Sequence, residues 1–189
     1  MKKVGILGGT FNPPHTGHLV IANEVLHAYG LDEVWFMPNQ VPPHKTVDEP
    51  ISQSDRLAML DLAVADNQQF RVEKAELDRS GPSYTYETMK ILKDMYKEID
   101  FHFIIGGDMV EYLPKWHKID ELVKMVKFVG VSRPSYSTET SYDILYAETP
   151  QMDISSSMIR ERVKGGKSIR YLLPDSVRVY IEEHGLYGT

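Results

Sequence analysis

Two histidines three positions apart lie in a short stretch rich in glycine and proline near the start of the chain. His15 and His18 belong to Gly-Gly-Thr-Phe-Asn-Pro-Pro-His-Thr-Gly-His, residues 8–18. Imidazole N–H groups can bond to phosphate oxygens and offset their charge. Gly8 and Gly9 let the backbone approach a ligand closely, and the two prolines restrict the loop. The stretch therefore predicts a site that neutralises a polyphosphate.

The neighbouring elements place these histidines at the start of a helix. An apolar run at residues 4–7 predicts a strand, and apolar side chains at helical spacing between residues 19 and 29 predict a helix after the loop. Thr16 is the expected N-cap. The first turn of a helix offers unpaired N–H groups and a partial positive charge, which favour a bound phosphate. The local structure and the histidines therefore point to the same anion.

Two other roles fit a pair of histidines. One ring could cap or pack while the other is solvated, which is the ordinary structural role. A zinc site would need a third and a fourth ligand. The chain has no cysteine, and its other five histidines show no paired ligand spacing, which argues against zinc. The motifs G-x-x-x-x-G-K-[ST] and G-x-G-x-x-G are also absent, so neither common phosphate-binding loop is present.

The composition is that of a protein with one ordinary core. Its 189 residues suit a single domain over 1–189. The absence of cysteine excludes a disulfide scaffold and fits a reducing compartment. The chain shows no signal-like apolar start and no run approaching about 18 apolar residues, so we expect a soluble, cytoplasmic protein. The formal net charge of −6 argues against a general nucleic-acid binder.

Strands and helices alternate along the chain, which predicts an α/β fold. A strand expected at 33–38 completes a strand–helix–strand unit with parallel strands. A further strand, at about 100–105, ends in Gly106-Gly107 and Asp108. Ligands of open α/β sheets bind beyond the carboxyl ends of the strands, where strand order reverses. We therefore expect a Rossmann-like open parallel sheet with helices on both faces and a crevice between Gly8-Gly9 and Gly106-Gly107.

The remaining elements follow from the same patterns. Short strands are expected at 70–72, 75–77, within 127–134 and at 144–146. Helices are expected at about 55–66 after Ser54, at 86–96 with Thr85 as N-cap, from about 155 to Gly165-Gly166, and at 174–184. No linker or repeat divides the chain, so the helical part from about residue 155 is expected to pack on the rest of the single domain.

Further residues are candidates for ligand contact. Ser156, Ser157 and Arg160 lie at a helix start, where hydroxyls and a forked guanidinium can hold phosphate oxygens. An ordinary serine cap with a surface arginine is the alternative. His44 and Lys45, in the long polar loop 39–50, would meet a phosphate or form a solvated basic pair.

Two positions later in the chain suit a planar or anionic ligand. Thr85 opens a helix after small polar residues, which predicts either a second anion site or an ordinary cap. Trp116 has polar neighbours and would stack on a planar ligand or fill the core. Asp108 would contact a ribose hydroxyl or cap the next helix. These alternatives stay open on the residues alone.

The first loop, together with Ile-Ser-Ser-Ser-Met-Ile-Arg at 154–160, resembles the two signatures of the nucleotidylyltransferase superfamily, H-x-G-H and I-S-S-T-x-x-R. Ser157 replaces the usual threonine and keeps the hydroxyl. Over nearly its whole length the chain also resembles bacterial nicotinate-nucleotide adenylyltransferases. The matching segments are Pro42 to Lys45, Ser83-Tyr84-Thr85, Gly106-Gly107-Asp108 and Trp116-His117.

The resemblance implies transfer of AMP from ATP to nicotinate mononucleotide, giving nicotinate adenine dinucleotide and pyrophosphate, a step of NAD synthesis. By motif, the ATP phosphates would be held by His15, His18, Ser156, Ser157 and Arg160. The adenosine would be framed by Gly8, Gly9, Thr10, Phe11, Gly106 and Asp108. The nicotinate ring would be received by Thr85, Tyr112 and Trp116. Arg133, in the polar turn after a strand, is a further candidate for ATP, and His44 and Lys45 are candidates for the acceptor.

The expected mechanism is direct in-line attack on the α-phosphorus, because the sequence offers no triad and no thiol nucleophile. Mg²⁺ would be carried by the ATP phosphates and not by a protein cage. Two alternatives remain: a sister adenylyltransferase for nicotinamide mononucleotide or phosphopantetheine, and a non-catalytic nucleotide sensor. A class I aminoacyl-tRNA synthetase fragment is disfavoured because no K-M-S-K-S stretch occurs. The oligomeric state stays open, a homo-oligomer included.

Overall fold

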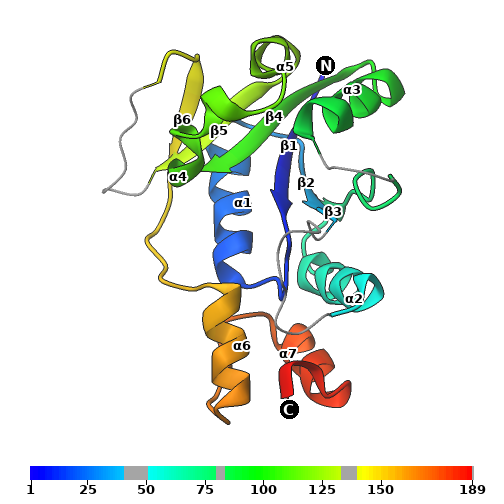
Figure 1. Cartoon of the computed structure of the whole chain (residues 1–189), viewed down its shortest axis with the longest axis vertical. Helices are drawn as coiled ribbons and strands as arrows, with labels where there is room; N and C mark the ends of the chain where they lie inside the picture. The colour runs from blue at the N-terminus through cyan, green and yellow to red at the C-terminus, as the bar shows by residue number, and fades with distance from the viewer. Residues whose placement is uncertain (41–50, 80–83, 133–139, 189) are drawn as a thin grey trace.

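Six parallel strands form one open sheet in the part of the chain that the structure describes (Figure 1). This computed structural model describes residues 1–40, 51–79, 84–132 and 140–188, without the side chains of Asp108 and Ser132. In chain order the strands are β1 (Lys2–Gly9), β2 (Glu33–Pro38), β3 (Phe70–Val72), β4 (Ile99–Gly106), β5 (Lys127–Ser132) and β6 (Ile144–Glu148).

The strand order β3-β2-β1-β4-β5-β6 reverses between β1 and β4. These two neighbours run parallel with Leu7 opposite Ile104, so their carboxyl ends reach the same edge of the sheet. The expected Rossmann-like parallel sheet is thus confirmed, and its reversal point lies between the two glycine pairs.

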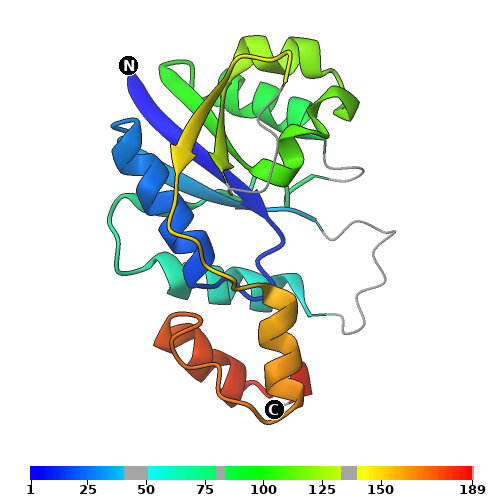
Figure 2. The ribbon, with the colours of Figure 1, turned by 90° about the vertical axis from the view of Figure 1, so that its left-hand side faces the viewer.

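Helices cover both faces of the sheet because its strands are apolar on both sides (Figure 2). The helical segments are α1 (Thr16–Ala28), α2 (Gln53–Val64), α3 (Thr85–Met95), α4 (Gly107–Val110), η1 (Leu113–Lys115), α5 (Ile119–Met125), α6 (Ser156–Lys164), α7 (Asp175–Glu183) and η2 (Leu186–Gly188). Within the described ranges, none of them is both long and apolar enough to cross a membrane.

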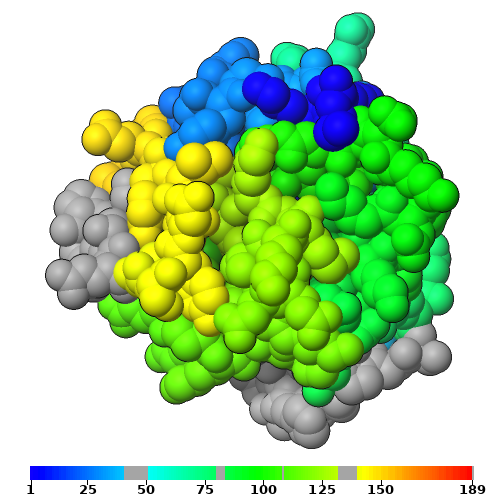
Figure 3. Space-filling view, turned by 90° about the horizontal axis from the view of Figure 1, so that it is seen from above, coloured from blue at the N-terminus to red at the C-terminus, as the bar shows by residue number. Residues whose placement is uncertain are grey.

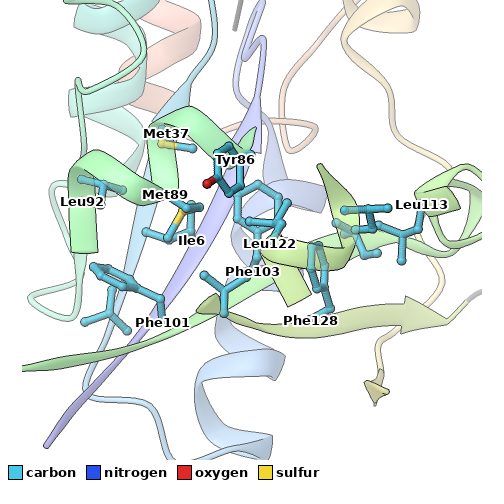
Figure 4. Close-up of a cluster of buried hydrophobic side chains, with 14 of the residues drawn as sticks. Ile6, Met37, Tyr86, Met89, Leu92, Phe101, Phe103, Leu113, Leu122 and Phe128 are labelled. Carbon is cyan, nitrogen blue, oxygen red and sulfur yellow. The ribbon is translucent and has the colours of Figure 1, made fainter. Parts of the chain in front are cut away.

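Alternating side chains of the central strands build two cores. Ile6 and Phe103 point to the face covered by α3 and α5, where Met89, Leu92 and Leu122 complete one cluster (Figure 4). On the other face, Leu7 and Ile104 pack with residues of α1 and α2, among them Ala22, Leu26, Leu60 and Val64. The period of two along a strand thus decides which helix each side chain meets.

A third core joins the C-terminal helices to α2. Met59 and Ala63 are buried on a different side of α2 from the sheet-facing Leu60, and they pack against Ile159 of α6 and Val177 of α7. Helix α2 therefore has apolar contacts on two sides. As a result, α6 and α7 lie at the end of the molecule toward which β1 runs, while α3 and α5 lie toward the opposite end, where β1 starts (Figure 1). Seen from that end, the first residues of the chain lie at the rim of the molecule (Figure 3).

Several expected boundaries differ from the observed ones. The N-cap of α1 is His15 and not Thr16. Helix α2 starts two residues earlier, because the Ser52 hydroxyl accepts a bond from the Asp55 N–H at 3.0 Å. Helix α3 begins at Thr85, after Tyr84 as N-cap. The segment 75–77 forms a turn and not a strand, since its amides have no neighbouring strand edge to pair with: β3 pairs with β2 only at residues 70–72.

Candidate active site

The loop between β1 and α1 is bonded directly to the start of α6. The Ser156 hydroxyl donates to the Pro13 carbonyl at 2.8 Å, and Nη1 of Arg160 donates to the Asn12 carbonyl at 2.8 Å. Nη2 of Arg160 also lies 3.2 Å from the Ser157 hydroxyl. The two segments that resemble nucleotidylyltransferase motifs, about 140 residues apart in sequence, are therefore one structural unit.

The imidazole rings of His15 and His18 stack, with centroids 3.7 Å apart and an interplanar angle of 26°. The backbone N–H of His15 donates to Nδ1 of His18 at 3.1 Å. Nδ1 of His18 is therefore an acceptor, so a neutral ring carries its proton on Nε2. That N–H is left to donate to a ligand.

Burial keeps both histidines neutral near pH 7. It lowers the pKa of His15 to about 4. Burial also lowers the pKa of His18 well below its usual value, and the neighbouring His15 adds to the effect. The neutral rings can therefore offer N–H donors but no positive charge, whereas Arg160, bonded to the same loop, carries one.

Two glycines make room for the rings of this loop. A Cβ on Gly17 would lie 3.1 Å from both Cε1 and Nδ1 of His15. A Cβ on Gly9 would lie 3.1 Å from the ring of Phe11. The backbone of Phe11 is left-handed, with a φ of +49°. Phe11 is buried and meets His18 edge-on at a centroid distance of 5.0 Å. Its side chain thus supports His18, although the resemblance assigned it to the adenosine.

A cavity of about 610 Å³ opens beside the two histidines. One wall is formed by His15, Gly17, His18, Ser155 and Ser156. The cavity is also lined by Ile154 of the 154–160 motif and by three parts of the chain that the sequence patterns did not indicate: Ile21, Val131 and the segment 149–152. That segment directly follows β6, so the rule that ligands lie beyond strand ends could have suggested it. Another cavity, of about 670 Å³, is lined by residues of α6, α7 and the segment between them, and it contains none of the predicted site residues.

The other expected ATP contacts lie around the reversal point or outside the described residues. Gly8 and Gly106 are exposed at the carboxyl ends of β1 and β4, and Thr10 is half-buried just beyond β1. Ser157 is exposed in the first turn of α6. Arg133, His44, Lys45 and the side chain of Asp108 are outside the described part of the structure.

The three residues expected to receive the nicotinate ring lie on the α3 side of the sheet. Thr85 is the first residue of α3, and the neighbouring Tyr84 stacks on His117 with centroids 4.5 Å apart. Trp116, half-buried, meets Phe103 edge-on at 6.1 Å. A Cβ on Gly8 would lie 3.6 Å from the Phe103 ring, so Phe103 contacts Trp116 and also lies close to the end of β1. Tyr112 is 54% exposed. The contact between these two regions is made by Tyr84 and His117, the chain neighbours of Thr85 and Trp116, which were given no role from the sequence.

The polar groups of the site suit an anion. Its donors are imidazole, hydroxyl and guanidinium groups. No cluster of three or more His, Cys, Asp or Glu side chains that could hold a metal ion occurs among the residues with described positions. Three buried side-chain atoms have no hydrogen-bond partner in the described structure, namely His15 Nδ1, Asn39 Oδ1 and Arg56 Nε. All three belong to, or contact, the loops at the carboxyl edge of β1 and β2.

Comparison with known proteins gives a consistent result. Residues 6–162 match the family described as cytidylyltransferase-like. The chain is 54% identical over all its 189 residues to the nicotinate-nucleotide adenylyltransferase of Bacillus subtilis, whose full length is covered. It is 58% identical over its whole length to a probable nicotinate-nucleotide adenylyltransferase of Geobacillus thermodenitrificans, of which 88% is covered.

Solved structures show the same fold at low sequence identity. The Plasmodium falciparum nicotinic acid mononucleotide adenylyltransferase complexed with NaAD superposes with a TM-score of 0.81 at 20% identity, over 99% of this chain and 98% of the other. A putative nicotinate-nucleotide adenylyltransferase from Vibrio parahaemolyticus gives a TM-score of 0.74 at 21% identity, over 100% and 96% of the two chains.

Proposed function

The chain belongs to the cytidylyltransferase-like family and, within it, to the nicotinate-nucleotide adenylyltransferases, and from this premise we propose how it transfers AMP from ATP to nicotinate mononucleotide. The products are nicotinate adenine dinucleotide and pyrophosphate. One observation supports the placement of the reaction: Ser156 and Arg160 bond to the loop that presents His15 and His18, at the edge of the sheet where strand order reverses.

The phosphate of the mononucleotide attacks the α-phosphorus of ATP in line with the leaving pyrophosphate. A P–O bond forms to the acceptor oxygen while the bond to the bridging α–β oxygen breaks. The attacking oxygen is already ionised at neutral pH, so the step needs no general base. Catalysis then comes from positioning and from stabilisation of charge on the α-phosphate and the leaving group.

His18 and Arg160 are the groups we assign to that charge. Nε2–H of His18 is free to donate, because Nδ1 is occupied by the His15 N–H. A guanidinium has five N–H donors. Arg160 uses one on Asn12 and one on Ser157, which leaves three for phosphate oxygens. The N–H groups at the start of α1 add a partial positive charge.

We assign Mg²⁺ to the ATP phosphates, where it would offset the charge of the leaving pyrophosphate. The donors around the crevice fit this arrangement, because hydroxyl, imidazole and guanidinium groups suit phosphate better than they suit a hard cation. The residues of the protein then need only hold the phosphate oxygens that the cation leaves uncovered.

The acceptor is assigned to the region between the start of α3 and Trp116. The nicotinate carboxylate would accept bonds from N–H groups at Thr85, where the helix start is partly positive. The ring would lie against Trp116, which is half-buried beside Phe103. Nicotinamide carries no charge and gains less from the helix start, which favours the acid over the amide.

Steady-state pyrophosphate release with ATP and three acceptors tests this function: nicotinate mononucleotide, nicotinamide mononucleotide and phosphopantetheine. We expect the highest kcat/KM with the nicotinate compound, by about tenfold or more over the amide, since a missing charged contact is costly. Faster turnover with another acceptor would identify a sister adenylyltransferase. ATP binding with no pyrophosphate from any acceptor would identify a nucleotide sensor.

A further inference from the structure

A buried arginine on α2 has no role in the site described so far. Arg56 is 2% exposed. Its Nη1 donates to the Thr10 carbonyl at 2.8 Å and to the Asn39 carbonyl at 2.9 Å. Thr10 immediately follows β1 and Asn39 immediately follows β2. One guanidinium nitrogen therefore links the loops that leave two neighbouring strands.

Packing alone does not explain an arginine at this position. Among the described residues no carboxylate forms an ion pair with Arg56, and its Nε has no hydrogen-bond partner. Burial lowers the pKa of the guanidinium. A buried charge without a counter-ion is costly, and the adjacent inward positions of α2 hold Met59 and Leu60. An apolar residue would be the less costly choice at this position.

The contacts of Arg56 fix the part of the chain that presents the histidines. Thr10 precedes Phe11, which has a left-handed backbone (φ +49°) and supports the His18 ring. Backbone in that region costs energy for a bulky residue and persists only when its surroundings hold it. The Asn39 N–H in turn donates to the Gly9 carbonyl at 2.9 Å. The Gly9–Phe11 segment is thus held by bonds from Arg56 and Asn39, neither of which lines the cavity.

We infer that Arg56 is a positioning residue for the adenylyl transfer, an inference that rests on the proposed function. By bridging the Thr10 and Asn39 carbonyls it holds the phosphate loop in the geometry that aims His18 at ATP. Its buried charge also adds to the local positive potential of an acidic protein. Arg56 itself does not contact the reacting atoms.

The test compares Arg56→Met, Arg56→Lys and a matched control, Arg178→Met. Methionine keeps most of the volume and removes the donors and the charge. Lysine keeps the charge on a shorter, unforked group. Arg178 is a largely buried arginine of α7 that pairs with Asp175 and Glu182, away from the crevice, so its loss affects stability alone. Each protein is assayed well below its Tm for pyrophosphate release, with ATP and the acceptor varied separately.

We expect Arg56→Met to raise the KM for ATP by about tenfold, because a misaligned loop loses phosphate contacts. We also expect it to lower kcat, so that kcat/KM for ATP falls by more than the change in KM alone. Arg56→Lys should have an intermediate effect, and Arg178→Met should leave both KM values unchanged. A role in folding alone would reduce the amount of active enzyme and leave the KM for ATP as in the wild type, which would overturn the inference.

Binding of a non-hydrolysable ATP analogue, measured by calorimetry, gives a readout that does not depend on the acceptor. Weaker binding to Arg56→Met than to Arg178→Met supports the inference, and equal binding overturns it. If Arg56→Met fails to fold, Arg56→Lys decides by the same comparison. A wild type that releases no pyrophosphate refutes the proposed function, whereas an active wild type matched by Arg56→Met refutes only the positioning role.

Discussion

His15 and His18 illustrate how residue type and environment contribute separately to a site. The spacing of the pair and the glycine between them indicate an anion-binding loop from sequence alone. Their neutral state could not be predicted, because it depends on how deeply the folded chain buries the two rings, which no local pattern shows. The positive charge needed to offset a polyphosphate is therefore carried mainly by Arg160 of α6, which bonds to the loop at Asn12.

Replacing His18 with alanine should lower kcat by about a hundredfold, or about 3 kcal/mol, which is typical for the loss of one donor to a transition-state charge. Pyrophosphate release measures it. His27→Ala is the control, because that histidine is exposed in the last turn of the same helix. A folded His18→Ala protein with near-normal turnover would remove this side chain from the mechanism.

Acidification should destabilise the protein through its neutral histidines. The unfolded chain takes up a proton on His15 near pH 6.5, whereas the folded state does so only near pH 4. The free energy of unfolding therefore falls as the pH decreases through this window, by about 2 kcal/mol between pH 7 and 5 from His15 alone. Urea denaturation of the wild type and of His15→Asn at both pH values measures this contribution. Equal losses in the two proteins would contradict it.

Gly17→Ala should separate stability from activity. Alanine normally stabilises a helix by up to about 1 kcal/mol relative to glycine. Here the added Cβ would press on the His15 ring at 3.1 Å. We expect little gain in Tm and a fall of about tenfold in kcat/KM for ATP, because a displaced ring misdirects His18. Unchanged kinetics with a raised Tm would show that the glycine is not needed for the ring.

At the scale of elements, the start of α6 is bonded to the histidine loop and forms the second half of the proposed phosphate site. Its serines, its arginine and its terminal Gly165-Gly166 allowed its position to be predicted closely from the sequence. Its partner, the loop at Asn12 and Pro13, could be inferred only from the resemblance of both segments to one superfamily. No local pattern shows that two carbonyls of that loop accept bonds from α6.

Arg160→Ala should therefore weaken both structure and catalysis. We expect a loss of about 1–2 kcal/mol in unfolding free energy from the broken bond to Asn12. A fall of about a hundredfold in kcat/KM for ATP should accompany it. Arg162→Ala is the control on the same helix, because Arg162 bonds to Ser168 and not to the loop.

The double variant His18→Ala/Arg160→Ala should lose less activity than the product of the two single losses, because both side chains are assigned to stabilise the same negative charge on the reacting phosphates. The same kinetic assay measures the coupling. Strictly multiplicative losses would indicate that the two side chains act at separate places.

Elements without strong periodicity were harder to predict. β1, β2 and β4 follow from apolar runs buried on both faces. The segment 75–77 shows an apolar–polar–apolar pattern, yet it forms a turn in which Glu76 is itself buried and accepts a bond from the Thr88 hydroxyl. Alternation indicates a strand only when the polar residue faces water, and that depends on tertiary packing.

At the scale of the whole molecule, the last residues of the chain reach the first loop. The Tyr187 hydroxyl donates to Oδ1 of Asn12, and the Leu172 carbonyl accepts a bond from the Thr16 N–H at 2.9 Å. Sequence patterns suggested that the C-terminal helices pack on the rest of the domain. They did not indicate these contacts, because single polar bonds between distant residues leave no periodic signal.

Tyr187→Phe should test this contact with a minimal change. It removes one hydroxyl and leaves the buried Asn12 side chain without that donor, which costs about 1–2 kcal/mol. We expect lower stability in urea and a several-fold higher KM for ATP. Tyr171→Phe, at a tyrosine that is 85% exposed, is the control. A variant that loses stability but keeps its KM would show that the tail supports the fold and not the loop.

The bonds from Arg160 and Tyr187 to Asn12 also bear on biosynthesis. During translation the N-terminal histidine loop leaves the ribosome first, long before the segments that complete it. A nascent chain that ends before residue 160 lacks half of the phosphate site, whatever the state of its sheet. The enzyme should therefore acquire its activity only after Arg160 and Tyr187 have left the ribosome, so a product that terminates before them would consume no ATP.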